Sequence, residues 1–445
     1  MSPIRRDVLR RRTNRTRTGT AFAAAALAGV TLLSVTACSD NGGSSDARGG
    51  GATAQAIGGD LGGLPDGLPS ELASALPSGL LDGLPNSLDE LKNWTFDDWD
   101  KWAEDHVFNN PVIKGLWDPD KMKHAKPKDQ DPPTDTPSGN PDDPSGDSGG
   151  SGSGGDDGGD GDGGDGDGDG SSDGMVRPLP TPIRATAVER PYTRNGAVGK
   201  IFFDEPDGTA VCSGTVVSDP AHPGKSNLVW TAGHCVHGGK GGDWYQHIIF
   251  VPGYNSSGTG SGGQQSLDKE LAPLGQWWGD DVVTSPQWAA EGPPATHGPV
   301  DKSSQYDFAV VRVHNPDGDG RSLEETVGGA VPVWFNAPRE NLAPVANWGY
   351  PAAQPFDGQE LYRCRSTVPP SRLSYDGSRP PMLVIGCTMT GGSSGGGWFA
   401  TMPDGRTGLV SNNSIGPIKD PTWEAGPYLG TVAEKMFDYF AKKTS

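Results

Sequence analysis

The stretch Leu228–Val236, LVWTAGHCV, runs from a short apolar strand through three small residues into His234 and Cys235. A catalytic histidine must be held in one tautomer beside a nucleophile, and small neighbours leave room for its ring to be approached. The stretch therefore makes His234 a candidate general base at the end of a β-strand.

A second candidate is Asp307, which opens the otherwise apolar run Asp307–Val313. A carboxylate beside an apolar strand tends to be neutralised, hydrogen-bonded or exposed. A hydrogen bond to the far nitrogen of His234 would supply that partner and fix the tautomer of the imidazole. Asp280 and Asp281, which precede a shorter apolar run, are weaker candidates for the same place.

The third candidate segment is the loop Cys387–Gly397, CTMTGGSSGGG, which contains the adjacent serines Ser393 and Ser394. Its glycines allow the backbone to turn tightly enough for two N–H groups to point at one carbonyl oxygen. A glycine- and serine-rich loop alone is often only a loop. Random agreement of three such segments, in the order His, Asp, Ser, is improbable.

Together the three segments resemble the chymotrypsin-fold serine proteases. TAGHC at 231–235 is similar to the histidine motif of that family, and DFAV at 307–310 is similar to its aspartate motif. GSSG at 392–395 fits its Gly-x-Ser-Gly nucleophile motif, and the loop looks most like the bacterial glutamyl-endopeptidase group. The resemblance covers about residues 185–445.

The resemblance implies roles for individual residues. Ser394 would be the nucleophile, His234 its general base, and Asp307 the residue that orients His234. The N–H groups of Gly392 and Ser394 would form the oxyanion hole. Taking Ser393 as the nucleophile instead would lose the glycine that follows the serine in the family motif.

The sequence has five cysteines, an odd number that needs an explanation in an exported protein. In the family, the cysteine after the histidine pairs with one on the preceding strand, which implies Cys212–Cys235. Cys364 and Cys387 are then expected to pair with each other. Cys38 is left over and belongs to the N-terminal region.

Zinc binding is the rival use of Cys212, His234, Cys235 and His237. Zinc ligand pairs usually stand two to four residues apart, and only Cys235 and His237 partly fit that spacing. Export also favours disulfides over free thiols. We therefore expect no metal and no cofactor.

The resemblance says less about specificity. Thr388 stands six residues before Ser394, where trypsin-like members have Asp, so cleavage after Lys or Arg is not supported. Ser411, Asn412 and Asn413 lie where glutamyl endopeptidases have a pocket histidine, so Glu specificity is not supported either. We expect these four residues to line the pocket and a neutral side chain to occupy it.

Ser393 also replaces the aspartate that, in digestive members of the family, receives a freed N-terminal ammonium during activation. We therefore expect no activation by insertion of a new N-terminus.

Short apolar runs bounded by Gly, Pro, Asn and Asp begin after about Ile183 and predict strands. Helical spacing of apolar residues predicts a C-terminal helix over Thr431–Lys443. With the resemblance, this gives an all-β fold of two six-stranded antiparallel β-barrels with a C-terminal helix, after a largely disordered N-terminal region. The predicted strands are Val198–Phe203, Ser213–Val217, Leu228–Trp230, His247–Val251, Asp307–Val313, Val331–Phe335, Met382–Ile385 and Thr407–Ser411.

The first 38 residues predict an export signal. Seven arginines precede an apolar run, Ala21–Val35, which is too short to span a bilayer stably. The run ends in VTAC, and small residues before a cysteine resemble the lipobox of bacterial lipoproteins, which implies lipidation of Cys38. An ordinary signal peptide cleaved near Ala37 is the alternative.

Two further regions precede the protease-like domain. Residues 39–125 are of low complexity and contain short helices, including one that Thr95 would cap. Residues 126–178 form an acidic linker rich in Gly, Asp and Pro, with fourteen Asp and no Lys or Arg between Asp129 and Asp173. This linker carries most of the net charge of −20, so the acidity says little about the partners of the folded part.

The sequence thus predicts an exported serine endopeptidase, on the outer face of the cell membrane as a lipoprotein or else secreted. Its partner is a protein or peptide substrate, and we expect a monomer. Nucleic-acid binding has no support, because no basic patch with interleaved aromatic residues is present outside the extreme N-terminus. The rivals are a non-catalytic envelope adhesion protein and an esterase that uses the same triad.

Overall fold

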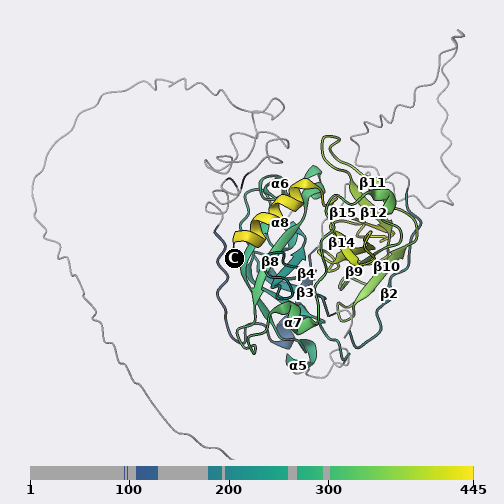
Figure 1. Cartoon of the computed structure of the whole chain (residues 1–445). Helices are drawn as coiled ribbons and strands as arrows, with labels where there is room; N and C mark the ends of the chain where they lie inside the picture. The colour runs from purple at the N-terminus through teal and green to yellow at the C-terminus, as the bar shows by residue number, and fades with distance from the viewer. Residues whose placement is uncertain are drawn as a thin grey trace, which may run out of the picture. The chain divides into compact units, whose positions relative to one another are not determined.

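Antiparallel strands form where apolar runs alternate with Gly, Pro, Asn and Asp turns (Figure 1). The computed structural model describes residues 95, 98, 107–128, 179–192, 196–258, 268–293 and 301–443. All of them belong to one unit, Gly62–Ser445. The predicted signal peptide, Cys38 and most of the predicted linker lie outside the described residues.

Six strands close the first barrel. Their order is β4-β3-β6-β7-β8-β5, and β5 pairs back with β4. All six pairings are antiparallel. Ile201, Phe203, Val229 and Phe250 are buried in its core. The strands are β3 (Val198–Glu205), β4 (Gly208–Val217), β5 (Leu228–Thr231), β6 (Gln246–Pro252), β7 (Trp277–Thr284) and β8 (Ala309–His314).

The strands of the second half form two hydrogen-bonded sheets around one core. Leu383 and Ile385 of the smaller sheet pack with Val345 and Trp398 of the larger one. The larger sheet has the order β14-β13-β9-β10-β2, and the smaller has the order β11-β12-β15. The strands are β2 (Thr186–Ala187), β9 (Val345–Gly349), β10 (Tyr362–Ser366), β11 (Ser371–Leu373), β12 (Met382–Gly386), β13 (Gly397–Thr401), β14 (Thr407–Asn412) and β15 (Trp423–Gly426).

The C-terminal helix α8 spans Thr431–Lys443, as the apolar spacing predicts. Its face of Val432, Met436 and Phe440 packs in one cluster with Trp230 and Phe308 of the first barrel. The chain therefore returns from its second half to pack against the first barrel. Helix α8 is drawn in yellow in Figure 1. The all-β prediction with a terminal helix is confirmed.

Shorter helical segments connect the strands. Of these, α7 begins with a capping box in which Ser322 and Glu325 satisfy each other's backbone N–H groups. The segments are α4 (Pro119–His124), α5 (Asp268–Leu271), α6 (Pro286–Glu291), α7 (Leu323–Val327) and the 3-10 turns η1 (Gly233–Cys235), η3 (Lys302–Tyr306) and η4 (Arg339–Asn341). Within the described ranges, none of the helices is long and apolar enough to cross a bilayer.

The predicted strand Val331–Phe335 is wrong. This segment carries two isolated parallel bridges, one from Val331 to Val217 of the first barrel and one from Val333 to Leu409 of the second half. Pro332 lies between them and has no N–H to donate to a ladder. The segment therefore crosses between the two halves instead of extending either sheet.

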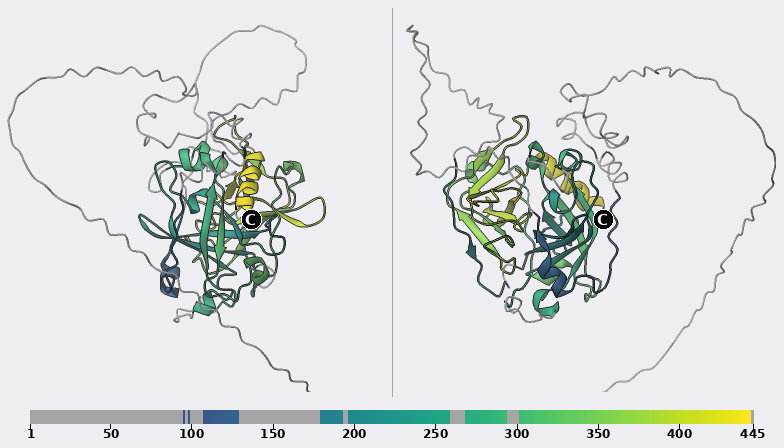
Figure 2. Two further views of the ribbon diagram at one scale, coloured as in Figure 1. Left: turned by 60° about the vertical axis from the view of Figure 1, so that its left-hand side comes forward. Right: turned by 180° about the vertical axis from the view of Figure 1, so that it is seen from behind.

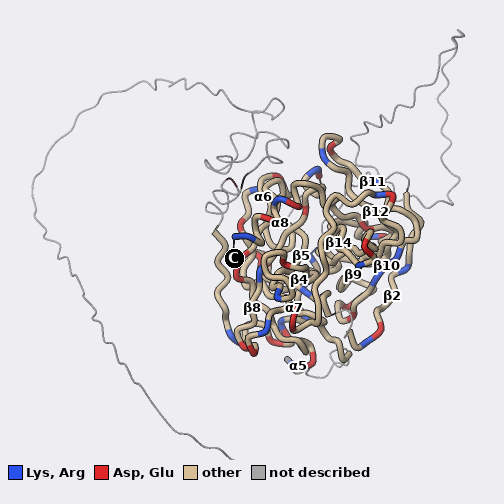
Figure 3. Tube along the Cα trace, viewed as in Figure 1, with Lys and Arg blue, Asp and Glu red and all other residues tan. Residues whose placement is uncertain are grey.

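Residues 107–128 lie against the first barrel, a placement that the sequence does not predict. They include α4 and the two-residue strand β1 (Lys126–Pro127), which pairs with β4 in parallel. In both views of Figure 2 this dark-blue segment runs along the teal strands. Basic and acidic residues are interspersed over the described part of the chain (Figure 3), whereas residues 129–173 of the predicted linker contain fourteen Asp and no Lys or Arg.

Candidate active site

The side chains of His234 and Asp307 meet because their strands are neighbours. His234 lies in η1, which begins two residues after the end of β5, and Asp307 lies two residues before the start of β8. The β5–β8 pairing sets Thr231 opposite Ala309. The Nδ1 atom of His234 lies 2.7 Å from one carboxylate oxygen of Asp307, and the backbone N–H of His234 donates to the other at 2.8 Å.

Asp307 is fully buried and accepts a third hydrogen bond, from the hydroxyl of Ser414 at 2.6 Å. Its backbone carbonyl accepts from the side-chain amide of Asn412 at 3.0 Å. A carboxylate only accepts, so Nδ1 of His234 must carry a proton. In the neutral imidazole, Nε2 is then the basic nitrogen.

Ser213 of β4 ties the loop of Ser394 to the first barrel. Its N–H donates to the carbonyl of Ser394 at 2.7 Å, and its hydroxyl donates to the carbonyl of Gly392 at 2.9 Å. The same hydroxyl accepts from the N–H of Tyr350 at 2.9 Å. One buried serine therefore fixes the loop on both sides of Ser393.

The loop needs glycine at two positions. Gly392 and Gly395 have φ angles of +94° and +79°, which L side chains rarely adopt. The backbone N–H groups of Gly392 and Ser394 have no acceptor among the described residues. Two N–H groups in this state are available to a carbonyl oxygen that enters the site.

The hydroxyl of Ser394 donates to the backbone carbonyl of Lys128, at 3.3 Å. Nε2 of His234 is buried and has no hydrogen-bond partner among the described residues. The structure therefore joins His234 to Asp307 directly, whereas the hydroxyl of Ser394 is directed at residue 128 of the same chain.

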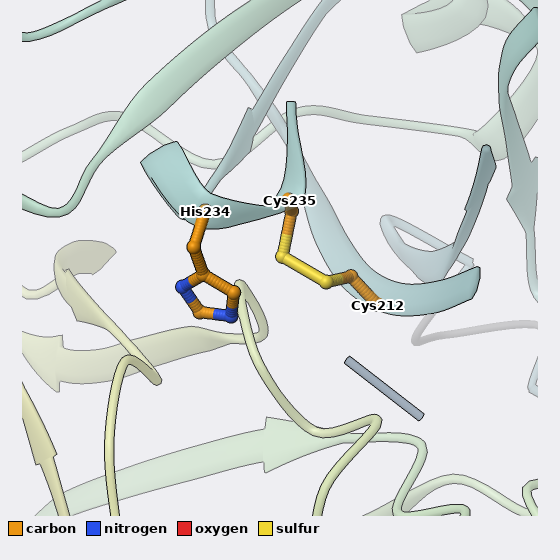
Figure 4. Close-up of side chains that lie close together, drawn as sticks. All are labelled: Cys212, His234 and Cys235. Carbon is orange, nitrogen blue, oxygen red and sulfur yellow. A yellow bond between two sulfur atoms is a disulfide. The ribbon is translucent and has the colours of Figure 1, made fainter. Parts of the chain in front are cut away.

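Both disulfides implied by the resemblance are present. Cys212 is bonded to Cys235, and Cys364 to Cys387. Figure 4 shows the imidazole of His234 beside the first bridge. Cys212, His234 and Cys235 lie close enough together to hold a metal ion. The disulfide ties up both sulfurs, however, so neither is available as the thiolate that zinc requires.

Two solved structures of serine proteases are similar to this chain. Over 99% of its length, the thermostable serine protease AL20 from an extremophilic microorganism is 32% identical to this chain. Protease Anisep from Arthrobacter nicotinovorans is 30% identical over 99% of its length. The chain belongs to the serine proteases. The two structures cover 56% and 58% of it, each with a TM-score of 0.44.

A Glu endopeptidase is also similar to this serine protease, at 16% identity and a TM-score of 0.41, over 59% of this chain and 99% of that one. A scan against protein-family models and a search of curated proteins found no match.

Beside Ser394 lies a cavity that is open to solvent and has about 440 Å³ of empty space. Its wall includes the carboxylate side chain of Glu424, a residue that is only 5% exposed. One carboxylate oxygen accepts from the hydroxyl of Ser393 at 2.6 Å, and the other accepts from the side-chain amide of Asn347. The cavity is lined by Ala353, Met389, Thr390, Gly391, Ser393, Ser394, Asn413, Ser414, Ile415, Gly416, Pro417, Ile418 and Glu424.

Of the four residues predicted to line the specificity pocket, Asn413 lines this cavity, and Thr388, Ser411 and Asn412 are not among its lining residues. The hydroxyl of Thr388 instead accepts from the N–H of Ala185. Ser411 donates to the carbonyl of Pro427. Asn412 holds the backbone of Asp307.

Three residues that touch this site were missed in the sequence: Ser213, Ser414 and Glu424. Ser213 lies in VCSGTVV, the phrase that carries Cys212, but nothing in that phrase shows where its hydroxyl points. Glu424 is a charged residue in the short stretch Trp423–Gly426, which is otherwise uncharged. A charge in such a stretch is the sequence feature that could have indicated a functional residue.

Two tyrosines near the site are neutral. Burial raises the pKa of Tyr350 well above its usual range. Burial, reinforced by the carboxylates of Glu205 and Asp307, does the same for Tyr245. Neither phenol therefore adds a negative charge around His234.

Replacing Gly395 by Ala should disrupt the loop of Ser394. A Cβ atom at this position would lie 2.1 Å from the hydroxyl oxygen of Thr231 and 2.4 Å from the carbonyl oxygen of Ser213. Gly405 has a similar φ of +84° but open space around it, so Gly405→Ala is a matched control for backbone strain alone. We expect Gly395→Ala to lower the free energy of unfolding by at least about 2 kcal/mol more than Gly405→Ala does.

Thermal or denaturant unfolding of both variants measures this difference. Equal losses of stability in the two variants would show that the contacts of Gly395 do not constrain the loop.

Proposed function

We propose that this serine protease is an endopeptidase whose triad is His234, Asp307 and Ser394. The observation that supports it best is the buried hydrogen bond between Asp307 and Nδ1 of His234. That bond leaves Nε2 of His234 as the base. Asp307 orients the ring and stabilises the imidazolium that forms during reaction.

In the proposed reaction, Oγ of Ser394 attacks the carbonyl carbon of a peptide bond and its proton passes to Nε2 of His234. The C–N bond then breaks, and His234 returns the proton to the leaving amine. The product is an ester between Ser394 and the acyl half of the substrate. Water, deprotonated by His234, then attacks the ester and releases the carboxyl half and Ser394.

The oxyanion that forms during acylation, and again during deacylation, would accept hydrogen bonds from the N–H groups of Gly392 and Ser394. Removal of one such donor costs about 10²- to 10³-fold in kcat in serine proteases. The bonds from Ser213 to the carbonyls of Gly392 and Ser394 keep these two N–H groups in place.

The test of this proposal is reaction with an aryl phosphonate, mapped by mass spectrometry on the full chain. We expect one adduct, on Ser394, and no adduct in Ser394→Ala. Ser393→Ala is the matched control, because Ser393 is adjacent but donates to Glu424, and it should still be labelled at residue 394.

An adduct on Ser393, or adducts scattered over other serines, would contradict the assignment of Ser394. No adduct on any serine would favour the non-catalytic adhesion protein. An adduct on Ser394 together with hydrolysis of esters but not of peptides would favour the esterase.

We further propose that the cavity beside Ser394 receives a Lys or Arg side chain of the substrate. Met389, Ile415 and Pro417 offer apolar contact to the methylene stem, and Glu424 offers a carboxylate to the cationic end. This replaces the neutral side chain that the sequence favours. The carboxylate comes from β15 and not from residue 388, the position at which trypsin-like members of the family carry Asp.

Glu424→Gln tests this assignment, because it removes the charge and keeps the shape. For peptides that differ only in the residue before the cleaved bond, we expect kcat/KM for Arg to fall about tenfold relative to Leu, or about 1.4 kcal/mol. Glu340→Gln, on the exposed surface, is the control. A uniform loss for all peptides would show that Glu424 only supports the loop through Ser393.

Export and a lipid tether at Cys38 are also proposed. The basic and apolar segments of residues 1–38 support them, and so do the two disulfides, which persist in oxidising compartments. Feeding cells an alkyne-tagged fatty acid should label the protein and place it in the membrane fraction. Cys38→Ser should lose both properties, whereas Ser44→Ala should lose neither. Equal labelling of Cys38→Ser would exclude this anchor.

A further inference from the structure

Residues 107–128, which we call the N-terminal strap, occupy an edge that the first barrel leaves open. On β4, the β5 strand pairs only with Thr215–Val217. The earlier part of β4 is therefore available, and β1 of the strap pairs with Ala210 and Val211 there. The N–H of Lys128 continues this pairing by donating to the carbonyl of Val211 at 3.1 Å. An unpaired strand edge is a ready site for another segment.

Asn110 fixes the beginning of the strap. Its side-chain amide donates to the carbonyl of Ile248 at 3.0 Å and to that of Gly279 at 2.9 Å. Its side-chain oxygen accepts from the N–H of Ile248 at 2.8 Å. One side chain thus bridges β6 and β7 where their own pairing ends, because β6–β7 pairing extends only over Ile249 and Phe250 on β6.

Trp117 anchors the middle of the strap in the protein core. It is 1% exposed, packs on Phe202 with ring centroids 5.6 Å apart, and donates from its indole nitrogen to the carbonyl of His247 at 2.8 Å. The side chain of Gln276 donates to its backbone carbonyl at 2.8 Å. A buried tryptophan with its N–H satisfied is a specific anchor and not a loose surface contact.

Two lysines of the strap pair with adjacent carboxylates at the end of β3. Lys121 lies 2.8 Å from Asp204, and Lys128 pairs with Glu205 in a largely buried position. Burial alone would raise the pKa of Asp204, but hydrogen bonds from Lys121, Thr209 and His247 together lower it. The barrel therefore offers the strap apolar, hydrogen-bonding and charged contacts.

The far end of the strap lies at Ser394, whose hydroxyl donates to the carbonyl oxygen of Lys128 at 3.3 Å. A bond about to be cut must present its carbonyl carbon to Oγ and its oxygen to the oxyanion hole. Here the oxygen faces Oγ, and neither the N–H of Gly392 nor that of Ser394 donates to a described residue. The peptide bond after Lys128 is therefore not placed for attack by Ser394, although it lies at the hydroxyl of that residue.

We propose that the N-terminal strap is a tethered ligand of the first barrel that covers Ser394 and keeps the serine protease latent until the strap is released. This inference rests on the proposed function, because it concerns access to the proposed nucleophile. The 50 residues from 129 to 178 connect the strap to the domain that it covers. A tether of this kind gives a ligand an effective concentration on the order of millimolar, so cutting it converts the strap into a ligand that can dissociate.

The test compares three full-length chains: the parent, Asn110→Ala combined with Trp117→Ala, and Lys114→Ala. Lys114 lies in the strap, but its ion pair with Asp317 is largely exposed, so its loss should not release the strap. The measured quantities are the rate of phosphonate labelling of Ser394 and kcat/KM for a short peptide. We expect both to be at least tenfold higher in the double variant and within twofold of the parent in Lys114→Ala.

A synthetic peptide of residues 107–128, added to the double variant, should then restore the low rate. The same peptide with alanine at residues 110 and 117 should not. If the double variant lacks a cooperative thermal transition, Asn110→Ala alone is judged by the same criteria, since it removes three hydrogen bonds and no buried ring.

The outcomes separate the two proposals. Equal, Ser394-dependent rates in all three chains would overturn the strap proposal and leave the endopeptidase standing. Failure of the peptide to inhibit a released variant would also overturn it, since the contacts of the strap would then not be those of a ligand. No Ser394-dependent reaction in any chain would refute the proposed function and the latency with it.

Discussion

The buried carboxylate of Asp307 is the constraint on which the rest of the site depends. A carboxylate without exposure is very unfavourable unless donors satisfy its oxygens. Here the donors are the N–H and the imidazole of His234, from the first barrel, and the hydroxyl of Ser414, which follows β14 in the second half. The requirement to satisfy one charge therefore positions His234 and joins the two halves of the molecule.

The strand β4 has a comparable role, since three successive residues on it serve three different partners. The carbonyl of Val211 accepts from the strap, Cys212 forms the disulfide to Cys235, and Ser213 holds the loop of Ser394. If β4 were shifted by one residue against its neighbours, each of these three residues would point to the opposite face of the sheet. The β3–β4 ladder, continuous over eight residue pairs, prevents such a slip.

The sequence predicts the chemical groups of the site better than it predicts the shape of the cavity beside them. The contact between His234 and Asp307 was predictable because each residue lies in a short contiguous phrase with its own apolar strand, whereas the cysteine pairing followed from the family resemblance. The cavity was not predictable, because Ala353, Ile415 and Glu424 reach it from separate segments whose approach only tertiary packing decides. The strap was missed for the same reason: its pairing with β4 spans more than eighty residues of sequence, and low-complexity composition on both sides concealed it.

The proposed latency would carry an energetic cost that constrains how it could work. Nε2 of His234 is buried without a partner, and a buried polar group in that state costs about 1–3 kcal/mol. The Lys128 contact at Ser394 does not offset this cost, because it takes the hydroxyl that would otherwise pair with His234. The offset must come from Asn110, Trp117 and the lysine pairs, which are remote from the reacting atoms. On the proposed latency, control over the site would be exerted on the outer surface of the first barrel, where it could change without altering His234, Asp307 or Ser394.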